Sequence, residues 1–187
     1  MASPIGHSLC GYAIYSTINK KINWKELLGF IVVANLADID FLFGFLIGEP
    51  NKYHHQFTHS IFISLIIAAV VACYFKFRNR RQIRNIFITV FSLYSSHVII
   101  DYFTRDTSPP YGEQLFWPFS NNYFISSISI FRDIYKASTS SEFFLSLFSY
   151  YNLWTILTEV IIFTILIVMV KIVRYSGRSG DSVQNSL

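Results

Sequence analysis

The chain has 187 residues, of which 52% are hydrophobic and only 14% are charged, and its mean hydropathy is +0.41. This composition excludes an ordinary soluble globular domain and indicates a membrane protein, and the length leaves room for one compact helical bundle. The net charge of +4 does not indicate a nucleic-acid-binding protein, because the basic residues are grouped between apolar segments and do not form one basic face.

Four long apolar segments predict membrane-inserted helices, and a shorter and more polar segment precedes them. The long segments are 27–47, 60–75, 86–103 and 153–170, and the short one is 4–18. Crossing the hydrocarbon core takes about 20 helical residues, so interfacial aromatic residues have to extend several of these segments. We therefore expect an all-α, multi-pass transmembrane bundle of four to five membrane-inserted helices with short interfacial helices.

The expected domain organisation is one membrane-embedded helical domain over residues 1–175 and a disordered polar tail over residues 176–187. The first residues, MASPIGHS, carry no basic region, so we expect no cleaved signal peptide. Basic residues cluster within 20–25, 76–84 and 171–178. If all three clusters are cytoplasmic, the apolar segments alternate in direction, and the N-terminus lies on the outer side.

Most unusual polar residues fall at one inferred depth, near the outer side. The set comprises all five histidines and three aspartates: His7, Asp38, Asp40, His54, His55, His59, His97 and Asp101. An aspartate at the centre of a membrane helix costs about 2.5 to 3.5 kcal/mol, and the four long segments contain no lysine or arginine to offset it. Any one of these residues alone is more often a hydrogen-bonding residue, but the whole set favours a divalent metal, above all zinc.

Spacing along the chain adds detail to this hypothesis. His97 and Asp101 are four residues apart and would share one helix face, and the same holds for His55 and His59. Glu159 lies in the last apolar segment, where it either pairs with a buried hydroxyl or contacts the metal.

The cysteines, Cys10 and Cys73, indicate neither a disulfide nor a thiolate site. The aromatic-rich segment 104–152 is either a roof of loops and short amphipathic helices over the site or an ordinary connection.

Five motifs in chain order resemble those of a known family. SPIGHS, NLADIDFL, HHQFTHS, SHVIIDYFT and GEQLFWPFS, which lie between residues 3 and 120, are similar to the motifs of the membrane-bound, metal-dependent hydrolases of bacterial inner membranes, of the LexA-regulated type. Members often have PD where this chain has Ala37 and Asp38, which should change only a local kink. The resemblance implies a multi-pass inner-membrane protein. The basic clusters, and not the resemblance, predict that its site lies toward the outer face.

The family often has HRG before the threonine and histidine, so the resemblance selects His54, whereas helical spacing favours His55 with His59. We follow the resemblance, because this stretch precedes the helix. The metal ligands are then expected to be His7, Asp38, His54, His59, His97 and Asp101. Asp40 is expected to act as the catalytic base or to orient a ligand, because on a regular helix it would point away from Asp38. If the helix breaks there, Asp40 could instead bind a second ion.

The family is also distantly similar to zinc-dependent phospholipase C, which suggests hydrolysis of a phosphoester by metal-activated water. The expected partners are the lipid bilayer and a lipid or lipid-linked phosphoester substrate, and no nucleic acid. The alternative is an ion- or proton-handling transporter that uses the same histidines and aspartates. A transporter commonly has inverted repeats, and the sequence shows none.

Cysteine labelling tests the expected topology. A cysteine placed between residues 78 and 84 should be labelled by a membrane-impermeant reagent only after the cells are opened, because this basic cluster is expected to be cytoplasmic. Labelling of the same position on intact cells would reverse the predicted orientation of every helix.

Overall fold

The computed structural model describes residues 1–19, 21–79, 83–107 and 109–184. The elements in chain order are α1 (Pro4–Ile18), α2 (Trp24–Ala34), the 3-10 helix η1 (Leu36–Ile39), α3 (Asp40–Leu46), the 3-10 helix η2 (Phe57–His59), α4 (Ile61–Asn79), α5 (Ile83–Tyr102), α6 (Ser140–Ser146) and α7 (Tyr150–Gln184). The described residues contain isolated β-bridges but no strand. The predicted all-α class is therefore confirmed.

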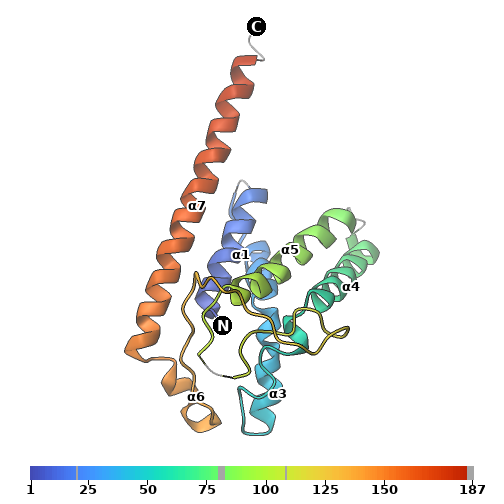
Figure 1. Ribbon diagram of the computed structural model, residues 1–187. Helices are drawn as coiled ribbons and strands as arrows, with labels where there is room; N and C mark the ends of the chain where they lie inside the picture. The colour runs from blue at the N-terminus through green and yellow to red at the C-terminus, as the bar shows by residue number, and fades with distance from the viewer. Residues whose placement is uncertain (20, 80–82, 108, 185–187) are drawn as a thin grey trace.

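The N-terminal helix α1 lies among the other long helices, and α5 connects it with α4. α1 contacts α2, α5 and α7, while α4 packs against α5. Figure 1 shows α7 running beside α1 and continuing well beyond the other helices, with α3 and α6 at the opposite end of the molecule. Many large apolar side chains of α7 are exposed, which fits a helix that faces lipid.

Two of the described helices are long and apolar enough to cross a membrane, namely α5 and the part of α7 from Tyr150 to Arg174. A third span is possible if α2 and the helices that follow it, which are bent by 64°, count as one. α1 has 15 residues, and the apolar part of α4, Ile61–Phe77, also falls short of the usual length. By length and composition the described helices thus provide two or three of the expected four to five spans.

The predicted single helix over 27–47 is interrupted at Asn35. Its side-chain amide donates to Ile31 O at 2.8 Å and to Ser8 Oγ at 3.1 Å, which ties the end of α2 to α1. An asparagine that bonds the preceding turn is a common end of a helix. The chain continues as η1 and then α3 in a different direction, so the spacing of Asp38 and Asp40 on a regular helix does not apply.

The last helix is longer than the apolar segment 153–170 that predicted it. α7 begins at Tyr150 and continues to Gln184. The sequence predicts a disordered polar tail over residues 176–187, and this stays a prediction; residues 185–187 lie outside the described residues.

The aromatic-rich segment between α5 and α7 is mainly irregular and contains one short helix, α6. It is held to the bundle by backbone hydrogen bonds: Gln114 N donates to His55 O at 3.0 Å, and Ile61 N donates to Leu115 O at 3.1 Å. Trp117 packs on Phe57, with ring centroids 5.8 Å apart. This part of the segment therefore lies against the histidine-rich loop before α4.

Asn152, at the start of α7, fixes the other end of this segment. It is fully buried, and its Oδ1 accepts a hydrogen bond from Tyr135 N at 2.7 Å. Its amide donates to Tyr135 O, Ser146 O and Leu147 O at 2.7 to 3.2 Å. One side chain thus satisfies backbone groups on both sides of α6.

Replacement of Asn152 by alanine should lower the free energy of unfolding by about 1 to 3 kcal/mol, because these buried backbone groups would lose their partners. Denaturant unfolding in detergent measures this change. Asn122→Ala, at an exposed position, is the control and should change stability by less than about 0.5 kcal/mol. Equal stability of the two variants would contradict the role assigned to Asn152.

Candidate metal centre

Four buried or nearly buried side chains from three elements meet at the centre of the site. Asp38 comes from η1, His59 from η2, and His97 and Asp101 from one face of α5. His97 Nε2 lies 3.2 Å from Asp101 Oδ2, 3.5 Å from Asp38 Oδ1 and 3.3 Å from His59 Nε2. One ligand atom from each of the four residues lies within 4.8 Å of the others, so the group can hold a metal ion.

The orientation of His97 is set by the end of α2. Its Nδ1 lies 2.8 Å from Ala34 O. A carbonyl oxygen only accepts, so Nδ1 carries the hydrogen and Nε2 presents its lone pair to the other three residues. Histidines that bind metals are commonly oriented in this way. The break after Ala34 therefore contributes both Asp38 and the acceptor that orients His97.

Asp40 orients two histidines. Its Oδ1 lies 3.2 Å from His54 Nδ1, and its Oδ2 lies 3.2 Å from His59 Nδ1. Thr58 Oγ1 also donates to Oδ2, at 2.8 Å. Because the carboxylate faces Nδ1 of both rings, their Nε2 atoms are left for other partners. Asp38 Oδ1 lies 3.8 Å from His54 Nδ1, so Asp38, Asp40 and His54 form a second possible ligand group.

His7 lies at the edge of the four-residue group. Its ring stacks on His97, with centroids 3.6 Å apart, and its Nε2 lies 3.4 Å from Asp101 Oδ1. The backbone N–H of Ala2 donates to the same oxygen at 2.6 Å, leaving Oδ2 of Asp101 for the centre of the site. The N-terminal segment and α1 thus approach the site beside α5.

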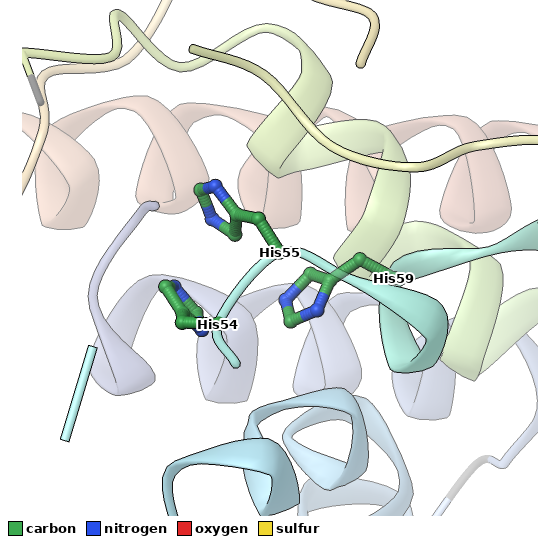
Figure 2. Close-up of side chains that lie close together, drawn as sticks. All are labelled: His54, His55 and His59. Carbon is green, nitrogen blue, oxygen red and sulfur yellow. The ribbon is translucent and has the colours of Figure 1, made fainter. Parts of the chain in front are cut away.

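His55 also belongs to the cluster, although the resemblance had selected only its neighbour. The chain turns at residues 51–55, and His55 has φ of 64°. Its Nε2 lies 3.7 Å from Asp101 Oδ2, and its Nδ1 lies 3.6 Å from Asp106 Oδ2. Figure 2 shows the rings of His54, His55 and His59 gathered along one loop, and the three form a third possible ligand group. A turn brings both neighbouring histidines to the site, where a helix would have separated them.

Several buried ring nitrogens and carboxylate oxygens have no hydrogen-bond partner among the described residues. They are both ring nitrogens of His7, both oxygens of Asp38, Nε2 of His54, Nε2 of His55 and Oδ2 of Asp101. Burial of such atoms without a partner is costly. Burial holds the pKa of His54 well below its ordinary value, so its ring is in the neutral, metal-binding form. Nitrogen and oxygen atoms of this kind fit a zinc-like cation.

Glu159 has a different partner from the residues of the cluster. It is fully buried in α7 and accepts hydrogen bonds from the backbone N–H and the hydroxyl of Ser3. A Cβ at Gly6 would lie 2.8 Å from Glu159 Oε2, so a larger residue there would displace the carboxylate of Glu159. Of the alternatives left by the sequence, the structure gives the hydroxyl pairing, which fixes the segment that carries Ala2 and His7.

Sequence reasoning did not assign two acidic residues that border the site, Asp106 and Glu113. Asp106 faces His55 and accepts a hydrogen bond from Gly112 N at 2.9 Å. Glu113 is buried, and neither of its carboxylate oxygens has a partner among the described residues. Both lie in the irregular segment after α5, where no helical spacing connects them with the histidines. Glu113 does belong to the motif GEQLFWPFS, so its place in that motif and its charge within an aromatic stretch were the signals that could have indicated a special role.

A comparison with known families agrees with a location in the inner membrane. The family model described as YdjM inner membrane protein matches residues 1–177. No curated protein and no solved structure matches the chain. Because the match covers nearly the whole sequence, the chain belongs to the YdjM inner membrane protein family.

Proposed function

We propose that this inner-membrane protein is a metal-dependent hydrolase that cleaves a phosphoester of a lipid or another amphiphilic substrate. The observation that carries the proposal is the meeting of Asp38, His59, His97 and Asp101, in which oxygens of both aspartates accept no hydrogen bond from the described residues. A purely structural cluster would be expected to satisfy these oxygens with hydrogen-bond donors.

These four residues would hold a divalent cation, for which zinc is our choice because of the mixed nitrogen and oxygen ligands. Asp38 also belongs to the group with Asp40 and His54, so it is placed to be shared with a second cation. His7 and His54 complete the proposed ligands. When bound, the metal supplies an acidified water and polarises the phosphoryl oxygen of the substrate.

The protein's own residues would orient this chemistry. Asp40 accepts from Thr58 and lies 3.2 Å from Nδ1 of both His54 and His59. These contacts favour its role as the residue that orients the ligands over a role as the catalytic base, because both its oxygens are already engaged. Ala34 O orients the ring of His97 by accepting a hydrogen bond from its Nδ1. The rings therefore need little rearrangement to bind a cation.

We place the site toward the outer face of the membrane, in a bundle of four to five inserted helices. The basic clusters support this orientation, because they precede or follow the apolar segments on the side opposite to the histidine-rich loop. Phe116 and Phe119 are exposed, and Trp117 packs on Phe57, two residues before His59. Aromatic side chains of this kind prefer the membrane boundary, where a lipid headgroup would reach the site.

Metal analysis of the detergent-purified protein tests the centre itself. The wild-type protein should contain a divalent metal, and His59→Ala and Asp101→Ala should each lower its content, because each removes a ligand. Glu49→Gln is the control: Glu49 is exposed and pairs with Lys52, so its substitution should not affect metal content. If neither site substitution lowers the metal content, the hydrolase proposal loses its basis.

Substrate preference tests the proposed access from the membrane. A long-chain phospholipid or lipid-linked phosphate should be cleaved with higher kcat/KM than its water-soluble headgroup analogue, because its chains can remain in the bilayer while the phosphate meets the site. Trp117→Ala should narrow this difference, whereas Trp24→Ala, at an exposed position at the start of α2, should not. Equal kcat/KM values for both substrates would show that the aromatic segment is an ordinary connection.

A further inference from the structure

Glu113 is the buried acidic residue beside the site that the proposed ligand set does not use. Its residue exposure is 1%, and neither carboxylate oxygen has a hydrogen-bond partner or an ion pair among the described residues. An ionised carboxylate in such surroundings would be strongly destabilising, whereas a protonated carboxyl group is tolerated. The side chain therefore needs a proton, a cation or a substrate group as its partner.

The backbone holds Glu113 firmly in this place. Its N–H donates to Phe124 O at 3.0 Å, and Phe124 N donates to its carbonyl at 2.9 Å. The preceding Gly112 has φ of +88°, and a Cβ there would lie only 2.4 Å from Phe124 O, so this pairing depends on glycine. The following residue, Gln114, donates its N–H to His55 O. Glu113 is thus fixed beside the histidine-rich loop.

The charged side chains of the cluster affect the pKa of Glu113. Burial raises the pKa of its carboxyl group well above the ordinary value, the charges of His59 and His97 oppose this shift, and the charge of Asp101 adds to it. Glu113 is nevertheless absent from each group of side chains that could share one ion. These observations favour a neutral acid next to the metal centre over another ligand.

We propose that Glu113 is the proton donor of the site, which protonates the leaving oxygen of the substrate. This inference rests on the proposed hydrolase function and names a catalytic residue for it. A neutral carboxyl group at the edge of a cluster of imidazoles and carboxylates is the usual form of a general acid.

In the reaction, a water oxygen forms a bond to phosphorus while the bond from phosphorus to the leaving oxygen breaks. The carboxyl proton of Glu113 moves to the leaving oxygen and gives an alcohol. One proton of the attacking water is released, and an equivalent proton returns to Glu113 from solvent. The phosphodiester and one water thus become a phosphomonoester and an alcohol, and no other reactant is consumed.

Two phosphodiester probes that differ only in their leaving group test this role. A 4-nitrophenyl group leaves as a stable anion and needs no proton, whereas an alkyl group needs one. Glu113→Gln keeps the size and neutrality of the side chain but removes the acid, so kcat/KM for the alkyl ester should fall about 100-fold. The value for the 4-nitrophenyl ester should stay within about 2-fold, since the other steps are unchanged. Equal losses on both probes would overturn the proposal.

Two further measurements do not depend on hydrolysis. Infrared difference spectra of wild type against Glu113→Gln at neutral pH should show the carbonyl band of a protonated carboxyl group, and its absence would overturn the proposal. Metal content should be the same in both proteins; a loss in Glu113→Gln would make Glu113 a ligand instead. Glu142→Gln, an exposed glutamate, is the control and should change none of these readouts.

These measurements distinguish a failure of the hydrolase proposal from a failure of the proposed role of Glu113. A wild-type protein that contains no metal and cleaves neither probe would contradict the hydrolase function, whereas the infrared band would still decide whether Glu113 carries a proton. Metal binding and cleavage of both probes by wild type, with no change in Glu113→Gln, would leave the hydrolase function intact and reject Glu113 as its acid.

Discussion

Three aspartates, Asp38, Asp40 and Asp101, lie inside or at the edge of an apolar bundle, and their only charged or ionisable partners within 4 Å among the described residues are histidines. The distances between imidazole nitrogens and carboxylate oxygens run from 3.2 to 3.8 Å. Carboxylates in this environment are stable only when their charge is offset. The side chains that surround these aspartates come from α1, η2, α5 and the loop before α4, so the site joins elements that are distant in sequence.

Helix breaks and turns bring these aspartates and histidines together. The end of α2 at Ala34 turns the chain so that Asp38 joins the central group while Asp40 holds His54 and His59. The positive φ of His55 places a further ring beside Asp101. Each irregularity would weaken an isolated helix, but here it brings a side chain into the cluster that we propose as a metal site.

Residues far from the centre keep these irregular parts in place. Glu159 on α7 binds Ser3, whose neighbour Ala2 donates to Asp101, so the last helix fixes the first residues of the chain against α5. The segment after α5 is bound to the histidine-rich loop through Gln114 and to α4 through Leu115. The segment after α5 also carries Glu113 and the exposed residues Phe116 and Phe119. The proposed proton donor and the proposed lipid contact therefore belong to one structural unit.

The sequence by itself determined the all-α class, the approximate positions of the helices and the set of histidines and aspartates that would meet. Composition, apolar segment length and the shared helix face of His97 and Asp101 are local properties that can be read along the chain. The family resemblance also indicated an inner-membrane protein, and the family match agrees with it. The proposed chemistry and the expected number of membrane-inserted helices remain predictions.

Only the tertiary structure decided which atoms face one another. At the break, Asn35 contacts Ser8 from another helix, and periodicity within 27–47 gives no sign of that contact. The inclusion of His55 depends on its backbone angle, and the isolation of Glu113 depends on a pairing with Phe124 across a turn. Spacing rules describe residues on one regular element, whereas this site is assembled from helix ends and loops whose geometry is fixed by contacts distant in sequence.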